Sequence, residues 1–363
     1  MPLPSSGAIT LNQIHTEVGG SSNATASLSD PDIRGLIGAQ QGDTISMGEF
    51  LGQAAPISVS ISNDISNSVN KMNVASYLSS QGWNGVGVAT LTIPSNVWVW
   101  SDSTGTAGMT ISGSFPKGLT INNNGKIIGK GGNAGDNSNT TGGSANGSNG
   151  GNAINITSSS SITINNNSGA FIAGGGGGGA AADQLKNTLG RNITGGAGSN
   201  VSGGGGGAGG GSGGAGTTFA AEPGGAINQT GDPVELSGTA YTTAAGAGGA
   251  GGSAGGGRQL PGVGGVFVSP FDNPSPSGIG DGGSANNAGG IGGFATNSSF
   301  PNGFITGGGG GGWGASGGSV AANQQGVTGM FTAASGGSGG KAIEDNGNSF
   351  TFTNNGTAYG ATT

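Results

Sequence analysis

The chain of 363 residues has no cysteine, a single histidine at position 15, and very little charge. Without cysteine it can form no disulfide bond and can perform no thiol chemistry. Only 7% of the residues are charged and the formal net charge is −7, with no basic run, which argues against nucleic acid as a partner. No apolar run approaches the roughly 18 residues that a membrane-spanning helix needs, so we do not expect the protein to be inserted in a membrane.

Glycine is what the sequence has in excess. Of the 89 glycines, 17 lie in residues 1–130 and 72 lie in residues 131–363. They form unbroken runs at Gly174–Gly179, Gly203–Gly207 and Gly307–Gly312. Glycine has no side chain to bury, and it loses more conformational entropy on ordering than any other residue. A folded domain of this composition must therefore be held together by its backbone.

Polyproline-II geometry meets this requirement. It has three residues per turn and no internal hydrogen bonds, so each N–H and C=O points outward toward a neighbouring strand. The composition therefore predicts a sandwich of packed polyglycine-II strands over residues 131–340, within a fold that is otherwise mostly irregular or β. The alternative is a disordered Gly/Ser linker. A linker would not explain the segments rich in Phe, Pro, Tyr, Trp and Arg that separate the glycine runs.

Three short helix signatures occupy the first 52 residues. Thr10–Gln13 and Ser46–Glu49 are capping boxes, and Asp30 precedes a proline at a first helical position. Helices this short are marginal alone. They could form a small self-packed cap, but we favour an attachment module, residues 1–55, that docks on another protein. The apolar residues assigned to attachment are Leu11, Ile14, Val18, Ile33, Leu36, Ile37, Phe50 and Leu51.

Residues 56–130 have the pattern of a small β-rich module, with a short helix over Val74–Ser80. The phrase Leu119–Gly129 is echoed by Ile162–Ile172 and, more weakly, by Phe350–Gly360. Each copy has a strand, an Asn/Gly turn and a second strand, which is the pattern of a β-hairpin. We expect such hairpins to clamp the glycine domain at one end, with residues 341–363 forming a C-terminal hairpin that returns to the clamp.

Several phrases resemble the glycine-rich receptor-binding tips of bacteriophage tails. They are Leu119–Gly129 running into Gly131–Gly135, Phe171–Ala173 before the first glycine run, and Gly339–Ile343 near the end of the chain. The family includes the tip adhesins of T-even-like long tail fibres and the glycine-rich ends of host-specificity proteins in lambda-like phages. Pro4–Leu11 resembles a leader found on many phage tail and virion proteins. Gln81–Gly85 resembles a phrase of the β module that precedes such tips.

The resemblance implies a sandwich of packed polyglycine-II strands whose connecting loops bind the host surface. The implied partners are a host envelope receptor, either a polysaccharide or an outer-membrane protein, and another phage tail or fibre protein bound through the N-terminal module. Met1–Ser6 lacks the features of a signal peptide. We therefore expect synthesis in the host cytoplasm and a place in the virion, on a tail fibre or tail tip. The alternative is a decoration or connector protein that uses the glycine domain as a spacer.

Catalysis has little support in the sequence. A glycosidase needs two converging carboxylates, and Glu222, Asp232 and Glu235 are near one another in the chain. Acidic residues in loops are more often solvated, so a polysaccharide depolymerase is a third and weaker hypothesis. His15 lies beside a helix stripe rather than in a triad pattern. We expect no enzyme activity, no cofactor and no metal.

The segments between glycine runs are better candidates for a binding site, because aromatic side chains and arginine dominate binding hot spots and aromatic rings stack on sugars. For Trp313, which is flush against a glycine run, an equal alternative is that it covers an edge of the glycine sandwich. The receptor-binding candidates are Gln184, Arg191, Phe219, Glu222, Tyr241, Arg258, Phe267, Phe271, Phe300, Trp313 and Phe331.

Overall fold

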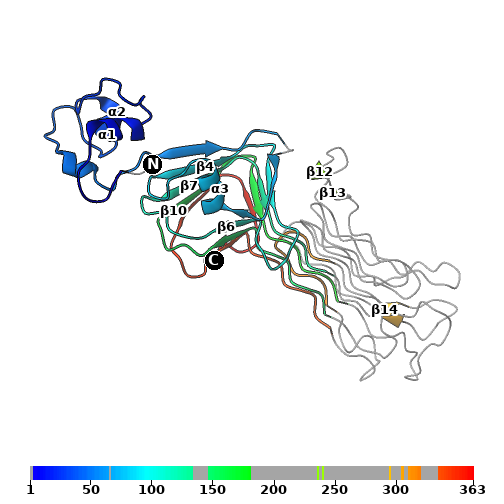
Figure 1. Ribbon diagram of the computed structural model, residues 1–363. Coiled ribbons are helices and arrows are strands. Elements are labelled where there is room, and N and C mark those ends of the chain that lie inside the picture. Colours follow the sequence, from blue (N-terminus) through cyan, green and yellow to red (C-terminus); the bar gives the residue numbers. More distant parts are fainter. Residues whose placement is uncertain are drawn as a thin grey trace.

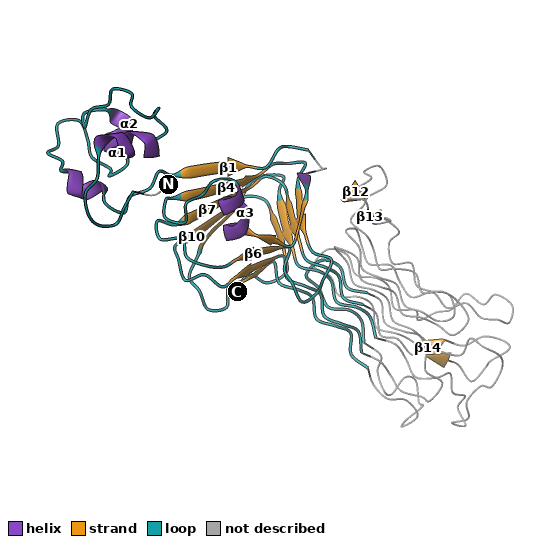
Figure 2. Ribbon diagram, in the orientation of Figure 1, coloured by secondary structure: helices purple, strands orange, loops and turns teal. Residues whose placement is uncertain are grey.

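The computed structural model describes five main stretches of the chain: residues 3–64, 67–133, 146–180, 310–319 and 334–363. It also gives the backbone of two antiparallel pairs of two-residue strands. These are β12 (Glu235–Leu236) with β13 (Thr239–Ala240), and β14 (Phe294–Ala295) with β15 (Phe304–Ile305). A helical N-terminal module, a central β region and a bundle of extended glycine segments follow one another across Figures 1 and 2.

The N-terminal module contains the three predicted helical segments, α1 (Leu11–Glu17), α2 (Pro31–Gly35) and the 3-10 helix η1 (Met47–Phe50). The capping box of α1 is confirmed, because Thr10 Oγ1 accepts from the Gln13 N–H and Gln13 Oε1 accepts from the Thr10 N–H. The predicted cap at Asp30 is wrong in detail. Its carboxylate accepts from the Ser27 N–H at 2.8 Å instead of from α2, although Pro31 does begin that helix.

The central region is built from three sheets in which every strand pair is parallel. The first sheet contains, in order, β1 (Ile57–Ser60), β4 (Ala89–Ile93), β7 (Leu119–Asn123), β10 (Ile162–Asn166) and β17 (Thr351–Asn354). The second contains β18 (Thr357–Tyr359), β11 (Phe171–Ala173), β8 (Lys126–Ile128), β5 (Trp98–Trp100) and β2 (Val69–Asn70). The third contains β16 (Ile343–Glu344), β9 (Ile154–Ile156), β6 (Met109–Ile111) and β3 (Met72–Asn73).

The chain visits the three sheets in a fixed rotation. It lays down β1, β2 and β3, then β4, β5 and β6, and continues in the same order, so that each turn adds one strand to every sheet. The last turn closes on the third sheet through a bridge between Ile343 and Thr362. The result is a three-sided parallel β-helix, and its stacked strands occupy the centre of Figure 1.

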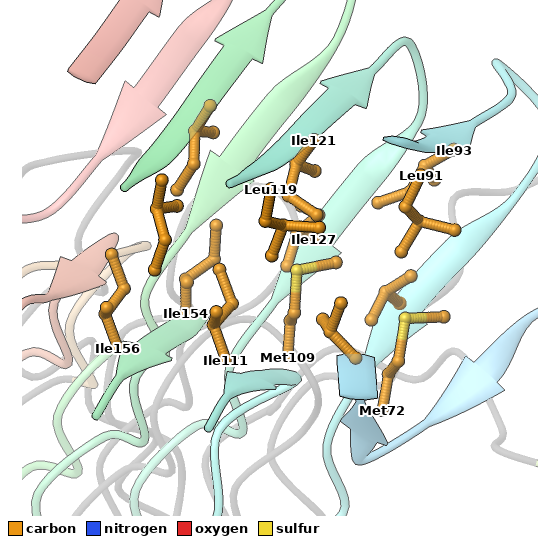
Figure 3. Close-up of a cluster of buried hydrophobic side chains, with 14 of the residues drawn as sticks. Met72, Leu91, Ile93, Met109, Ile111, Leu119, Ile121, Ile127, Ile154 and Ile156 are labelled. Atoms are coloured by element: carbon orange, nitrogen blue, oxygen red, sulfur yellow. The ribbon is translucent and has the colours of Figure 1, made fainter. Parts of the chain in front are cut away.

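The core of the β-helix consists of one inward-facing row from each sheet. Leu91, Ile121 and Ile164 occupy equivalent positions in the first sheet and are fully buried. Ile127 and Ile154 face them from the second and third sheets, as Figure 3 shows for part of this cluster. The predicted helix is confirmed as α3 (Val74–Ser80), which adds Val74 and Leu78 to the same core.

The predicted β-hairpins are wrong. β7 and β8 do not pair with each other, although a two-residue Asn/Gly turn separates them. Instead, β7 pairs in parallel with β10, and β10 with β17. The recurring phrase is thus the repeat of successive turns of the β-helix, and residues 341–363 supply its last strands. The β structure also extends past the predicted limit at residue 130, since β9, β10 and β11 continue the same three sheets.

A ladder of asparagine side chains runs inside the first sheet, where the three strands of the repeat end. Asn123 Nδ2 donates to Asn166 Oδ1 at 2.8 Å, and Asn166 Nδ2 donates to Asn354 Oδ1 at 2.8 Å and to the Thr357 carbonyl at 3.1 Å. Asn123 and Asn166 are completely buried. A buried amide is tolerated only when it is hydrogen-bonded, so the ladder fixes which strands stack and in which register.

Asn166→Ala is therefore expected to destabilise the protein by about 3 kcal/mol, since it removes three ladder bonds and leaves the buried Asn123 amide with only a long contact, 3.4 Å, to the Phe171 carbonyl. Chemical denaturation of the full chain would measure the loss. Asn165→Ala is the matched control: Asn165 is partly exposed and makes one ladder bond, to Asn122 at 2.9 Å. Its expected cost is under about 1 kcal/mol. Equal costs for the two variants would contradict the role given to the buried ladder.

Candidate functional site

The glycine segments all leave the β-helix at one corner, between the second and third sheets. The connection from β8 to β9 contains the segments 129–133 and 146–151, and the connection from β11 to β16 contains 174–180, 310–319 and 334–340. The two connections leave neighbouring strands of the second sheet, β8 and β11, and enter neighbouring strands of the third sheet, β9 and β16. Their glycine segments therefore start side by side. They run together away from the β-helix in Figure 1.

Backbone hydrogen bonds join the glycine segments, and each neighbour is contacted at intervals of three residues. The segment 174–180 donates to residues 148–151 and to Ala315 and Gly318, and it accepts from three other segments, at distances of 2.7–2.9 Å. These bonds include Gly175 N–H to Gly151 C=O, Gly178 N–H to Ser148 C=O, Gly340 N–H to Gly175 C=O, Gly337 N–H to Gly178 C=O, Gly314 N–H to Gly174 C=O, Gly311 N–H to Gly177 C=O and Gly132 N–H to Gly176 C=O.

Asparagine side chains follow the same three-residue interval. Asn146, Asn149 and Asn152 each accept a hydrogen bond from a backbone N–H of the segment 335–341. The donors, Ser335, Ser338 and Lys341, are also three residues apart. This pattern was not predicted, although the regular spacing of asparagines between glycines is visible in the sequence.

The segments are packed too closely for any side chain at several positions. A Cβ added at Gly177 would overlap the carbonyl of Gly337, and one at Gly175 would overlap the carbonyl of Lys130. Backbone groups thus occupy the space that a side chain would need, which is the physical reason for glycine at these positions.

Trp313 lies at a turn where the glycine chain meets the β-helix. Its ring stacks on Phe171 of β11, with centroids 4.9 Å apart, and contacts Tyr359 of β18 at 4.8 Å. Only 6% of the residue is exposed. This burial corrects the prediction that Trp313 is a loop contact for a receptor, because its ring is covered by the outer face of the second sheet. The alternative, that it packs at an edge of the glycine segments, agrees with its position.

A small charged group lies at the same corner of the β-helix. Lys71 Nζ is 2.6 Å from Asp102 Oδ1, and Asn70 Nδ2 donates to Asp102 Oδ2 at 3.1 Å. The hydrogen bond from Lys71 lowers the pKa of Asp102 below its ordinary value, while burial lowers the pKa of Lys130. The lowered pKa of Asp102 favours an ionised carboxylate held by Lys71, which is an ion-pair arrangement and not that of a proton-transferring acid.

The other receptor-binding candidates lie outside the described residues. They are Gln184, Arg191, Phe219, Glu222, Tyr241, Arg258, Phe267, Phe271, Phe300 and Phe331. In the chain they belong to two connections, 181–309 and 320–333. The described glycine segments border these connections at residues 180, 310, 319 and 334. Their assignment to receptor binding stays a prediction.

The residues assigned to attachment form the hydrophobic core of the N-terminal module. Ile14, Ile33 and Phe50 are completely buried there, next to the nearly buried Leu3. Leu11, Val18, Leu36 and Ile37 pack around them and remain partly exposed, as does Leu51. The three buried side chains hold the module together and cannot themselves contact a partner. Any docking surface must use residues that are still exposed.

Glu17 joins the N-terminal module to the β-helix, because its Oε1 accepts from Asn84 Nδ2 at 3.2 Å. The same oxygen accepts from the N–H of Ala55, the last residue of the module, at 3.0 Å. The part of the chain that the structure describes contains no group of three His, Asp or Glu side chains arranged to hold a metal ion. Within it, no helix is both long and apolar enough to cross a bilayer.

Residues 57–363 match the family model described as "Phage tail fibre adhesin Gp38". The chain therefore belongs to this family of phage tail fibre adhesins, proteins of the virion tail that bind the host surface. The match begins at β1, so the N-terminal module lies outside it.

A solved structure is also similar. It is the gp37–gp38 adhesin tip complex of the long tail fibre of bacteriophage S16, matched with a TM-score of 0.45 and 18% sequence identity over 99% of this chain and 100% of that chain. No curated protein sequence matches the chain.

Proposed function

We propose that the glycine segments form a polyglycine-II scaffold whose distal connections bind a receptor on the host envelope. The observation that carries the proposal is the three-residue interval of the hydrogen bonds between segments, both backbone to backbone and from backbone to Asn146, Asn149 and Asn152. Three residues per turn is the repeat of polyproline-II geometry, and it turns successive backbone groups toward different neighbours. The overlap that added Cβ atoms would cause supports the same geometry.

A rigid scaffold of this kind is suited to presenting receptor-binding residues on the connections between its glycine segments. Rigid frameworks commonly place binding residues on the loops they support, and here the connections 181–309 and 320–333 follow directly on the glycine segments in the chain. They contain the aromatic residues and arginines of the candidate site. The receptor would be a polysaccharide or an outer-membrane protein, bound without chemical turnover.

The segment around Arg258 and Phe271 is the best candidate for recognition. Its four prolines, at positions 261, 270, 274 and 276, limit the entropy lost when the segment is ordered by binding. Phe267 and Phe271 offer apolar or stacking contacts, and Arg258 offers a charge for envelope phosphates or carboxylates.

Arg258→Ala combined with Phe271→Ala is expected to slow adsorption of the phage to its host at least about tenfold, since hot-spot residues typically contribute ~1–4 kcal/mol each. The melting temperature should not change. The matched control replaces one cation and one apolar residue on the β-helix surface, Lys117 and the exposed Val88, by alanine. Unchanged adsorption of the Arg258→Ala, Phe271→Ala variant would indicate that another connection binds the receptor. A lower melting temperature of this variant would indicate that the two residues stabilise the fold.

We further propose that the N-terminal module attaches the chain to another protein of the tail fibre. The module has its own core and is linked to the β-helix by few hydrogen bonds, which is the organisation of a separate docking unit. It would place the adhesin at a fibre or tail tip.

A further inference from the structure

A groove of about 600 Å³ opens on the N-terminal module, on the side formed by the loop of residues 39–45 and the chain from η1 to Gln53. Its lining is apolar at Ile37, Ala39 and Ile45 and acidic at Asp43 and Glu49. We propose that this groove is the docking site for a basic, partly aliphatic segment of another tail-fibre protein. The proposal rests on the attachment role of the module and specifies where and by what chemistry attachment occurs.

The apolar part of the groove is the exposed side of the module's core. Ile37 and Ile45 pack against the buried Ile14, Ile33 and Phe50 while remaining partly exposed. A docked aliphatic side chain would extend a core that already exists, so its burial would be favourable without rearrangement of the module.

The N-terminal module has a clear excess of acidic over basic residues. Residues 1–56 contain Glu17, Asp30, Asp32, Asp43 and Glu49, but their only lysine or arginine is Arg34. Arg34 is just 6% exposed, and its guanidinium donates to the carbonyls of Leu28, Gln40 and Asp43. The one cation is therefore enclosed within the module. The surface that remains is complementary to a basic partner, which charge attraction would also guide into place.

The two carboxylates of the groove have free capacity to accept hydrogen bonds. Asp43 Oδ2 accepts from the Gln40 N–H at 2.7 Å, and Glu49 Oε2 accepts from the Ser46 N–H at 3.3 Å. Among the described residues neither one forms an ion pair. An ionised carboxylate has about four acceptor sites, so each could still receive the ammonium of a lysine or the guanidinium of an arginine.

The groove is also held in shape before any partner binds. Arg34 fixes the loop of residues 39–45 through the carbonyls of Gln40 and Asp43, and Gln53 Nε2 donates to the Glu49 carbonyl at 3.3 Å on the opposite wall. A preformed site lowers the ordering cost of association. The hydrogen bonds to the β-helix come from Glu17, which lines a different hollow of the module with Asn12 and Ser22, so docking in the groove leaves that joint in place.

Charge reversal in the full-length chain tests the proposal. Virions assembled without their own copy of the chain are mixed with the purified protein, and the amount incorporated is measured by quantitative immunoblot. Asp43→Lys combined with Glu49→Lys is expected to reduce incorporation at least tenfold, and Asp43→Lys alone to reduce it measurably. Asp32→Lys is the matched control, because it makes the same charge change on the same module outside the groove; its incorporation should stay within twofold of the parent.

Parental incorporation of the double variant would overturn the groove as the docking site. A variant lacking residues 1–52 separates this outcome from failure of the attachment role itself. If that deletion abolishes incorporation while the double variant incorporates normally, the module attaches through another surface. If the deletion also has no effect, attachment does not depend on the module at all. A melt of each variant confirms that it is folded.

The absence of cysteine from the chain permits a direct identification of the partner segment. Thr44→Cys, in the groove lining, carries a thiol-linked photo-cross-linker, and Ser22→Cys carries it in the other hollow. Irradiation of reconstituted virions should link Thr44→Cys to a peptide of a different fibre protein that contains lysine or arginine. A link only from Ser22→Cys, a peptide without a basic residue, or a link to a second copy of this chain would each contradict the proposal.

Discussion

Replacement of Gly177 by valine is expected to destroy the packing of the glycine segments while leaving the β-helix folded. An added Cβ at this position would overlap the carbonyl of Gly337, which is backbone that a rotamer change cannot move aside. Gly177 also takes part in two hydrogen bonds to the segment 310–319, donating to the Ala315 carbonyl and accepting from the Gly311 N–H. The segments would have to separate, which we expect to cost about 3 kcal/mol or more.

Amide hydrogen exchange measures this effect segment by segment. Protection in residues 174–180 and 334–340 should fall by about a hundredfold or more in Gly177→Val, since ~1.4 kcal/mol corresponds to a factor of ten. The buried strands β7 and β10 should keep their protection. Gly35→Val is the control, because Gly35 has open space around it and no left-handed backbone angle. Parental protection in Gly177→Val would refute the close packing of backbones.

Removal of the ring of Trp313 is the second change with a large expected effect. Trp313→Ala should lower the free energy of unfolding by about 3–5 kcal/mol, the range for truncating a buried aromatic residue. The loss comes from the stacking on Phe171 and Tyr359, which anchors the turn of the glycine chain to the second sheet. Limited proteolysis should then cleave the glycine region sooner than the β-helix.

Trp313→Phe separates the packing of the ring from its polar atom. The indole N–H of Trp313 is buried and has no hydrogen-bond partner among the described residues. Phenylalanine keeps most of the stacking area and removes this unsatisfied donor, so its cost should be under about 1.5 kcal/mol. If Trp313→Ala melted like the parent but slowed adsorption, the residue would be a receptor contact and its structural role would be wrong.

Local sequence signals predicted the elements that local interactions determine. The capping box at Thr10 and the helix over Val74–Ser80 follow from contacts within a few residues, and both are confirmed. The family was also recognisable from phrases that flank the glycine runs. The glycine content correctly indicated segments joined through their backbones, because glycine offers no side chain for packing.

The arrangement of the strands could not be predicted in the same way. A strand, an Asn/Gly turn and a second strand can form either a hairpin or a corner of a β-helix, because the turn does not determine which distant strand each one pairs with. The available signal is the recurrence of the phrase itself, because equivalent asparagines of its copies form the ladder from Asn123 to Asn166 and from Asn166 to Asn354. The copies are 43 and 188 residues apart, so no constant period marks the turns of the β-helix in the sequence.

The candidate binding residues illustrate a second limit. Aromatic residues are enriched both in binding sites and in buried contacts, so composition alone did not separate Trp313, which packs on the β-helix, from the aromatic residues of the connections 181–309 and 320–333. The same ambiguity affected the N-terminal module, where Ile14, Ile33 and Phe50 form a core. Burial distinguishes the two roles, and burial depends on contacts that are distant in the sequence.

Competition for the host surface tests the central claim most directly. Purified full-length chain is added to host cells before the phage, and the rate of phage adsorption is measured against the protein concentration. The account predicts that adsorption falls with increasing protein and that the Arg258→Ala, Phe271→Ala double variant competes at least about tenfold more weakly. Unchanged adsorption at concentrations at which the folded protein saturates the cells, or no binding of the folded protein to host cells at all, would contradict it.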